Sequence, residues 1–173
     1  MTLELSQEQQ ILQETVREFS QTEILPLASK IDLDCLVPKE LTSKLPNIGL
    51  FGISVPSEFG GAGGDFLSLV IACEEVSRVS GSLGAQISFH NAVVCEALIA
   101  SANTTLKAEL LQSLASGTLG AFDFSSDTLR NHLTCKIKGN ELVVNGASDY
   151  VTSAADAGVF LFAANLSEEG KRA

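Results

Sequence analysis

Four glycines lie close together near the middle of the first hundred residues, in Val-Pro-Ser-Glu-Phe-Gly-Gly-Ala-Gly-Gly-Asp at residues 55–65. Pro56 ends the element before this segment, and the glycines permit positive φ angles that other residues resist. Asp65 directly precedes an apolar stretch, where its carboxylate can cap the first turn of a helix. The segment therefore predicts a tight connection into an apolar helix. A flexible loop between helices is the alternative.

The same glycines do not form a nucleotide-binding motif. The dinucleotide fingerprint G-x-G-x-x-G needs a third glycine, and counted from Gly61 and Gly63 that position holds Phe66. A P-loop needs Gly-Lys followed by Ser or Thr, whereas Gly64 is followed by Asp65, whose charge repels phosphate. Neither class of nucleotide site is indicated.

Charge and hydropathy exclude several classes of partner. The formal net charge is −10 and the sequence pI is about 4.5. This negative charge disfavours binding to nucleic acid, whose phosphates require cationic partners, and binding to anionic lipid. It does not exclude a CoA thioester, because a few local cations can outweigh a global excess of acids. The most apolar run, residues 66–73, is too short to cross a bilayer, so no membrane insertion is expected.

The cysteines predict neither a metal site nor a redox motif. They are far apart, form no C-x-x-C and do not cluster with histidine. A chain of this length and apolar content needs no disulfides, so reduced thiols are expected. Residues 1–5 lack the basic and apolar parts of a signal peptide. We therefore expect a cytoplasmic protein. The cysteines are Cys35, Cys73, Cys95 and Cys135.

Apolar residues at helical spacing predict five helices in the first two thirds of the chain. Ser6 and Gln9 form a capping box for the first helix, and Pro38 suits the start of the second. The third helix is apolar on more than one face, which predicts deep burial. The helices are expected at residues 7–23, after residue 38, at 65–80, after 82 and after 104. The expected core includes Phe19, Leu45, Ile48, Val70, Ile71, Val76 and Leu110.

Beyond the helices the pattern changes to short apolar runs. Residues 119–124 and 158–164 are strand-like, and residues 133–144 predict a β-hairpin that turns at Gly139 and Asn140. Five helices followed by strands indicate an α+β fold, with an N-terminal all-α bundle and a partial antiparallel β-domain after it. The boundary is expected near residue 117, which gives domains 1–117 and 118–173.

Several segments together resemble the acyl-CoA dehydrogenase family. Residues 55–65 are similar to its Pro-Glu-x-Tyr/Phe-Gly-Gly loop. Upstream, residues 15–19 and 24–28 resemble its first helix and the exit from that helix. Downstream, residues 114–117 and 120–122 resemble its passage into a β-domain. The resemblance implies a truncated family fold, in which an N-terminal helical domain and an incomplete middle β-domain are present and the C-terminal helical domain is absent.

The resemblance also implies an activity. Members of this family use FAD to remove an α-proton and a β-hydride from an acyl-CoA thioester, which yields the trans-2-enoyl-CoA in fatty acid metabolism. The reaction needs a carboxylate base, hydrogen bonds to the thioester carbonyl and a flavin ring beside the β-carbon. FAD is thus the implied cofactor and acyl-CoA the implied substrate.

One of the family's flavin-binding turns, Thr-Glu-Pro-Gly-x-Gly-Ser-Asp, is several residues short in this chain. Residues 124–128, Phe-Ser-Ser-Asp-Thr, stand in its place. The resemblance places Ser125 on the family's Thr, toward the flavin pyrimidine edge. In another alignment Ser126 matches the closing serine, which faces the pyrophosphate. The glycines that let backbone N–H groups approach the pyrophosphate are missing, and a polar β-turn without a ligand is the alternative.

A second flavin-binding segment is better preserved. Residues 144–154 resemble the family's Leu-Asn-Gly-x-Lys-x-Trp-Ile-Thr-Asn. The resemblance places Tyr150 on the tryptophan, as an aromatic side chain able to lie against the flavin rings. It places Thr152 on the threonine that approaches flavin N5, where a hydroxyl can steer the hydride. An ordinary β-strand triplet is the alternative.

No catalytic residue is assigned. In the family the catalytic glutamate lies in a later helical domain, and no residue of this chain matches it. Glu74, Glu75 and Glu96 are expected to be solvated or paired on helix surfaces. His90 and Asn91 match a recurring family helix, and their apolar neighbours predict a hydrogen-bonded core histidine.

The expected partners follow from what the chain lacks. Family members continue with further strands and a four-helix domain that supplies the base and the oligomer contacts. Without a strand that returns after residues 167–173, residues 158–164 would form an apolar edge that another chain must cover. Two hypotheses remain open. One is a fragment or split subunit, inactive alone and completed by a second chain or a homo-oligomer. The other is a non-catalytic assembly subunit derived from the family.

Overall fold

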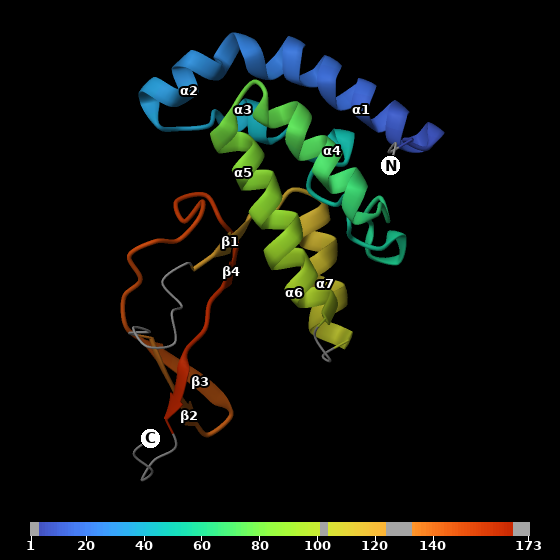
Figure 1. The fold of residues 1–173 in the computed structure, drawn as a ribbon. Coiled ribbons are helices and arrows are strands. Elements are labelled where there is room, and N and C mark those ends of the chain that lie inside the picture. The colour runs from blue at the N-terminus through green and yellow to red at the C-terminus, as the bar shows by residue number, and fades with distance from the viewer. Residues whose placement is uncertain (1–3, 101–103, 124–132, 168–173) are drawn as a thin grey trace.

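The computed structural model describes residues 4–100, 104–123 and 133–167. Helices occupy one end of the molecule and strands the other (Figure 1). The two parts meet where helix α5 (Gly81–Phe89) passes strand β1 (Gly120–Phe122). Helices followed by a small partial sheet confirm the predicted α+β class.

The first helix begins as predicted and continues further than expected. The hydroxyl of Ser6 accepts from the backbone N–H of Gln9, and the side chain of Gln9 accepts from the backbone N–H of Ser6, which confirms the capping box. Pro26 lies in the first turn of a 3₁₀ segment, where its missing N–H costs nothing, so the expected helix exit is only a change of pitch. The segments are α1 (Gln7–Phe19), π-helical η1 (Ser20–Ile24), η2 (Leu25–Leu27) and α2 (Ala28–Asp34).

The glycine segment folds back on the chain just before it. It follows α3 (Lys39–Thr42) and η3 (Pro46–Ile48) and contains η4 (Ser57–Phe59). A Cβ on Gly61 would lie 2.1 Å from the carbonyl oxygen of Val55, so only glycine fits there. The segment therefore forms a close turn into the helix that follows it, as the sequence predicts. The backbone N–H groups of Ala62, Gly63 and Gly64 donate to the carbonyls of Gly52, Val55 and Ile53 at 2.7–2.9 Å.

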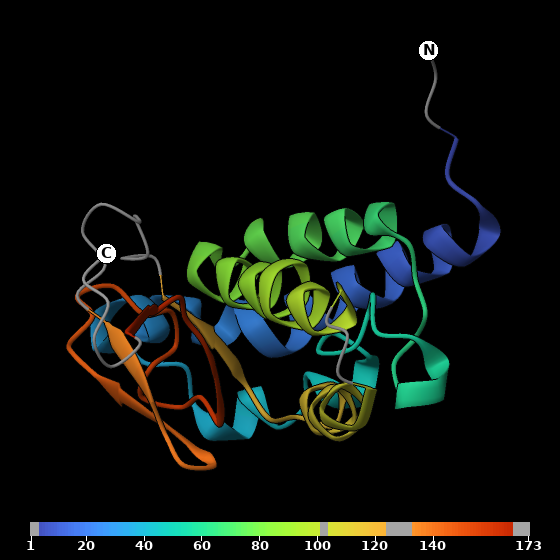
Figure 2. The same cartoon turned by 90° about the horizontal axis from the view of Figure 1, so that it is seen from below.

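Helix α4 (Phe66–Ser77) confirms the predicted cap and corrects the predicted core. The carboxylate of Asp65 accepts from the Ser68 N–H at 2.8 Å. Helices α1 and α5 pack against α4 and bury Ile71, but Val70 is 44% exposed. The prediction that Val70 belongs to the core is wrong, because α4 is apolar around its circumference and its neighbours leave the face that carries Val70 uncovered. Figure 2 shows α4 and α5 side by side with α1 beyond them.

The helical stretch after α4 is long, and one side of it is buried. Three segments run on as one stretch, Gly81–Ala100, which is longer than the apolar run noted in the sequence. By length and composition alone it is a candidate to cross a membrane. In this fold it packs between α4 and β1 as a core helix, with Leu83 and Ile87 fully buried. The segments are α5, the π-helical η5 (His90–Cys95) and α6 (Glu96–Ala100).

The core consists of two clusters of buried side chains. The larger joins α1, α4, α5 and residues 41–53, and the smaller lies between η5 and α7 (Thr104–Ala115). Leu45, Ile71 and Val76 are buried as predicted. Phe19 and Ile48 are partly buried against the larger cluster, and Leu110 is half-buried.

The strands form two small sheets of mixed direction. β1 pairs in parallel with β4 (Val159–Leu161). β2 (Thr134–Lys138) pairs antiparallel with β3 (Glu141–Asn145) and in parallel with β5 (Asn165–Ser167). The predicted hairpin is confirmed, and it turns at Gly139 with φ +64°. The expectation of an antiparallel β-domain is corrected, since both pairings between distant strands are parallel.

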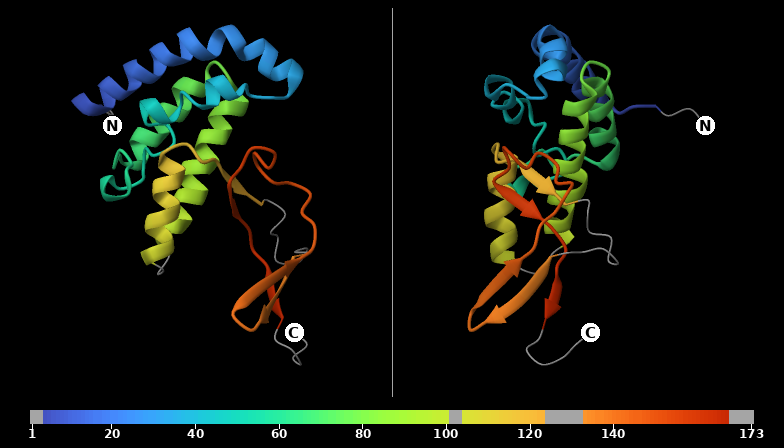
Figure 3. Two further views of the ribbon diagram at one scale, coloured as in Figure 1. Left: turned by 180° about the vertical axis from the view of Figure 1, so that it is seen from behind. Right: turned by 90° about the vertical axis from the view of Figure 1, so that its left-hand side faces the viewer.

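The hairpin projects away from the helices (Figure 3). Every residue of β3 is exposed, and Ile137 of β2 is 58% exposed. The joint at β1 is different, because Ala121 is fully buried and a Cβ on Gly120 would lie 2.8 Å from the Val94 side chain. The strands are thus anchored to the helical part at β1, while the hairpin has no apolar layer over it within the described residues.

Candidate functional site

Two of the four predicted flavin-binding residues lie in the described part of the chain. Thr152 and Tyr150 lie in the loop between β3 and β4. Ser125 and Ser126 fall outside the described residues, so their predicted roles stay predictions. The site is therefore built from Thr152 and the groups around it.

The hydroxyl of Thr152 is held at the end of β1. It accepts a hydrogen bond from the Phe122 N–H at 2.8 Å, and the Thr152 N–H donates to the Phe122 carbonyl at 2.9 Å. The contact from the hydroxyl to that same carbonyl is long, at 3.4 Å. The hydroxyl is the donor in this contact, and 3.4 Å is well beyond the usual length of such a bond, so a ligand acceptor could take the proton in place of the Phe122 carbonyl.

The residue after Thr152 is fixed by a contact from α5. Ser153 adopts φ +51°, an unusual left-handed conformation for a residue with a side chain. The side-chain amide of Gln86 donates to its hydroxyl at 3.1 Å across 67 residues of sequence. The other end of this side chain, Gln86 Oε1, is buried and has no hydrogen-bond partner among the described residues.

These residues border a pocket of about 400 Å³, named here the Thr152 pocket. One wall is a single face of α5, whose lining residues recur at helical spacing. The other walls are the segment after α2 and the loop from Thr152 to Asp156. A volume of this size suits a small ligand, and the mostly apolar lining with a few polar groups suits an acyl chain that ends in a polar function. The lining residues include Leu36, Val37, Ser82, Ala85, Gln86, Phe89, Leu119, Thr152 and Ala154.

The side chains present here fit part of a flavin site. Thr152 offers a hydroxyl proton at the pocket edge, and Gln86 contributes a buried acceptor that lacks a partner among the described residues. Tyr150 is 73% exposed, so its ring face is available for a planar ring to lie against. These residues would hold the flavin ring, while the segment that would face the pyrophosphate lies outside the described residues.

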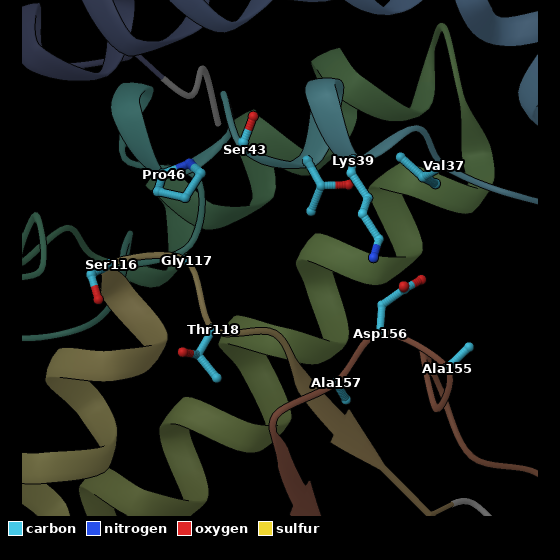
Figure 4. A pocket seen from close by; sticks show the side chains of 11 residues that line it. Val37, Lys39, Ser43, Pro46, Ser116, Gly117, Thr118, Ala155, Asp156 and Ala157 are labelled. Carbon is cyan, nitrogen blue, oxygen red and sulfur yellow. The ribbon is translucent and has the colours of Figure 1, made fainter.

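A second pocket, of about 640 Å³, adjoins the first and is named here the Lys39 pocket. The two share Val37, Thr42 and Asp156 among their lining residues. Lys39 of α3 and Asp156 of the β3–β4 loop point toward one another across it (Figure 4). The hollow between the helical part and the β3–β4 loop is therefore apolar at the Thr152 end and carries opposite charges at the other.

Of the three helix acids considered in the sequence, Glu74 and Glu75 are paired and Glu96 is exposed, and Glu75 is buried rather than on the helix surface where it was expected. Both carboxylate oxygens of buried Glu75 accept from Arg17, at 2.7 and 3.0 Å, and this hydrogen bonding lowers the pKa of Glu75. Glu74 pairs with Arg78 at 2.8 Å. Asp123 is buried and accepts from the Ser148 hydroxyl, which ties the β3–β4 loop to β1. None of these carboxylates lines the Thr152 pocket, and no catalytic base is assigned.

His90 is the hydrogen-bonded core histidine that the sequence predicts. It is fully buried, stacks on Phe51 at a centroid distance of 4.7 Å and contacts two backbone groups. Nδ1 accepts from the Gly120 N–H at 3.0 Å, so the proton lies on Nε2, which donates to the Phe51 carbonyl at 2.9 Å. Burial lowers the pKa of His90 to about 4, so the ring is neutral at pH 7.

Sequence reasoning missed Gln86, Ser153 and the pair of Asp123 with Ser148. Their contacts join residues far apart in the chain, and each is an ordinary polar residue in its own segment. One signal pointed toward Gln86, since it is a large polar side chain between Leu83 and Phe89 in a mostly apolar helix. Within residues 4–100, 104–123 and 133–167, no three His, Cys, Asp or Glu side chains gather as a metal site requires.

The sequence of this chain matches a known protein family. The model of the family described as "Acyl-CoA dehydrogenase, N-terminal domain" matches residues 6–118. This chain belongs to the acyl-CoA dehydrogenase family. The resemblance noted in the sequence is thereby confirmed.

Curated acyl-CoA dehydrogenases match beyond that domain. The short-chain specific acyl-CoA dehydrogenase of Clostridium acetobutylicum is 34% identical over 168 residues, which cover 93% of this chain and 44% of the relative. Bovine mitochondrial isovaleryl-CoA dehydrogenase is 34% identical over 165 residues, 91% of this chain and 39% of the relative. The chain thus spans less than half the length of these relatives.

Solved structures of acyl-CoA dehydrogenases share the fold. A glutaryl-coenzyme A dehydrogenase in complex with glutaryl-CoA superposes with a TM-score of 0.85 at 30% identity. The match covers 92% of this chain and 43% of the dehydrogenase chain. A glutaryl-CoA dehydrogenase from Mycobacterium smegmatis in complex with FADH2 superposes with a TM-score of 0.85 at 23% identity. This match covers 94% of this chain and 43% of the M. smegmatis chain. These matches confirm that the described helices and strands form the N-terminal part of the acyl-CoA dehydrogenase fold.

Proposed function

We propose that this chain forms the N-terminal part of an FAD-dependent acyl-CoA dehydrogenase, as a fragment or a split subunit. With the rest of the enzyme it would convert an acyl-CoA thioester to the trans-2-enoyl-CoA. The observation that carries the proposal is the Thr152 hydroxyl at the edge of the Thr152 pocket, which accepts a short hydrogen bond from the Phe122 N–H and donates its proton only in a long contact of 3.4 Å to the Phe122 carbonyl. That geometry suits a donor to flavin N5.

Each residue of the site has a stated part in this proposal. Thr152 donates its hydroxyl proton to the flavin, and Tyr150 lies against the flavin rings. The apolar α5 face of the Thr152 pocket binds the acyl chain and excludes water from it. The flavin, when bound, supplies the hydride acceptor, which no side chain provides. Ser125 and Ser126 remain the proposed contacts to the pyrimidine edge and the pyrophosphate.

The remainder of the enzyme supplies the catalytic base. No carboxylate of this chain matches the family's base, and loss of a general base costs about 10²–10⁴ in rate. We therefore propose a second chain or a covalent continuation as partner, acting in the cytoplasm, and expect no turnover from these 173 residues alone.

One observation favours a second function, that of a non-catalytic assembly subunit derived from the family. Residues 124–128 lack the glycines that allow backbone N–H groups to approach a pyrophosphate. A chain that no longer binds flavin could still use its exposed apolar strands to join a partner. Flavin content separates the two functions.

The test is a fusion of residues 1–167 to the part of the C. acetobutylicum relative that follows its matched region. The fusion should purify with flavin absorption bands and oxidise a short-chain acyl-CoA with an artificial electron acceptor. Thr152→Val removes the hydroxyl and should weaken FAD binding by about 0.5–1.5 kcal/mol, or roughly two- to tenfold. Thr152→Ser keeps a hydroxyl and should restore most of that affinity.

Thr22→Val is the matched control, because Thr22 is an exposed residue of η1 whose hydroxyl donates to the Glu18 carbonyl one turn earlier. This substitution should leave flavin affinity unchanged. A fusion that folds but binds no flavin would reject the dehydrogenase function and favour the assembly subunit. If the Thr152→Val fusion binds flavin as tightly as the unsubstituted fusion, only the Thr152 contact is rejected.

A further inference from the structure

One face of the helix formed by α5 and η5 contacts the Thr152 turn at one point and strand β1 at another. Gln86 donates to the Ser153 hydroxyl at 3.1 Å. Four residues later, His90 Nδ1 accepts from the Gly120 N–H at 3.0 Å. Because residues four apart lie on the same face of a helix, one helix face makes hydrogen bonds to both the Thr152 turn and β1.

A short series of hydrogen bonds connects His90 to the Thr152 hydroxyl. His90 fixes Gly120 at the start of β1, and Phe122 lies at the end of this three-residue strand. The Phe122 N–H donates to Thr152 Oγ1 at 2.8 Å, and the Phe122 carbonyl accepts from the Thr152 N–H at 2.9 Å. A shift of β1 along the helix would therefore move the Thr152 hydroxyl with it.

The histidine itself is held firmly. Its ring is buried, stacks on Phe51 and donates from Nε2 to the Phe51 carbonyl, so the orientation of Nδ1 is set from the helical side. His90 also begins the π-helical segment η5, where the widened turn changes the direction of side chains relative to an α-helix. Such segments occur often at functional sites.

We propose that His90 is a positioning residue for the Thr152 hydroxyl, with Gln86 as a second support on the same helix face. His90 lines neither the Thr152 pocket nor the Lys39 pocket and acts only through β1. The inference rests on the proposed function in one respect, namely that the Thr152 hydroxyl faces the flavin. The hydrogen-bonded connection itself belongs to this chain alone.

The first test is the position of the His90 ring proton in the unmodified chain. Nitrogen NMR of the imidazole should show the proton on Nε2 at pH 7, because Nδ1 must accept from Gly120. A proton on Nδ1 would remove the acceptor and overturn the proposal. This measurement needs neither a variant nor flavin.

The second test compares amide hydrogen exchange in three variants. His90→Phe keeps a planar ring on Phe51 but loses both hydrogen bonds, and His90→Gln keeps a donor and an acceptor. Val16→Ala, in α1, lowers stability without touching the connection. Relative to the Ala72 amide in α4, exchange at Phe122 and Thr152 should rise at least tenfold in His90→Phe and return toward the original rate in His90→Gln.

Equal relative exchange in His90→Phe and Val16→Ala would overturn the proposal, since His90 would then act only through global stability. If His90→Phe fails to fold, Gln86→Met offers the same comparison at the Ser153 amide, and an unchanged rate there would count against the proposal. The NMR and hydrogen-exchange measurements are made without flavin. A fusion that fails to bind FAD would therefore reject the proposed function while the positioning of Thr152 is judged separately.

Discussion

The helical and strand regions of this chain differ in how completely each buries its own apolar residues. Apolar side chains from Val16 to Leu114 fill two clusters between helices, and Leu119 and Ala121 extend these to the start of the strands. Past Ala121, no described apolar residue is fully buried. Yet the strands are as apolar as the helices, with exposed Ile137, Leu142, Val144, Phe160 and Leu166.

This difference separates two sources of structure. The helices are fixed by burial, which contributes most of the free energy of folding. The hairpin is fixed by backbone pairing and turn geometry, which give marginal stability without a covering layer. Members of the family are more than twice as long as this chain, so the strand region is where a continuation or partner has apolar surface to cover.

The largest expected effect tests the helical core. Ile71 is 4% exposed, so Ile71→Asp places an unpaired charge inside α4 and should lower the free energy of unfolding by about 4 kcal/mol or more. Urea denaturation followed by circular dichroism measures this change. Val70→Asp is the matched control, because Val70 is 44% exposed and the same substitution there should cost less than about 1 kcal/mol. Equal costs would mean that both faces of α4 are covered.

The next effect concerns the joint between the two regions. Burial lowers the pKa of His90 from 6.5 to about 4, so the unfolded chain binds a proton in this range that the folded chain excludes. The free energy of unfolding should therefore rise from pH 4 to pH 6.5, by about 3 kcal/mol from this group. Denaturation curves at a series of pH values measure the slope.

His90→Gln does not titrate and should flatten the curve between pH 4.5 and 6.5. Glu75, whose pKa is lowered by its hydrogen bonds to Arg17, adds stability above pH 4.5 that is lost as the pH falls further. Its contribution lies at lower pH and should remain in the variant. An unchanged slope in His90→Gln would show that His90 is accessible to protons in the folded chain.

Local signals in the sequence predicted the parts of the fold that depend on neighbouring residues. The capping box of Ser6 and Gln9, the Asp65 cap and the turn at Gly139 are each decided within a few residues. The same reasoning failed for Val70. A helix that is apolar all round does not reveal which face is buried, and the positions of the elements packed on it, chiefly α1 and α5, decide that face.

The site was predictable only in part, for a related reason. Resemblance to the family singled out Thr152, but the groups that hold it come from α5 and β1, more than 25 residues away in sequence. The parallel pairing of β1 with β4 is equally non-local, since its register from Gly120 with Val159 crosses the whole hairpin. Neither spacing nor composition encodes such contacts in a form that a single sequence reveals.

The smallest expected effect in the isolated chain is also the sharpest test of the comparison. Val144 of β3 pairs with Cys135 in the hairpin and is 40% exposed. Val144→Lys should therefore change the free energy of unfolding of this chain by less than about 0.5 kcal/mol. In the fusion with the remainder of a dehydrogenase, where a covering layer is expected, the same lysine should lower soluble yield and flavin content. Glu141→Lys, an exposed polar position on the same strand, is the control and should be tolerated both in the isolated chain and in the fusion.

A loss above about 2 kcal/mol for Val144→Lys in the isolated chain would mean that the hairpin has a core of its own, and the contrast between the two regions would fail. Equal tolerance of both lysines in the fusion would mean that β3 stays uncovered, and the surface that covers the strands would have to be sought at Phe160 and Phe162.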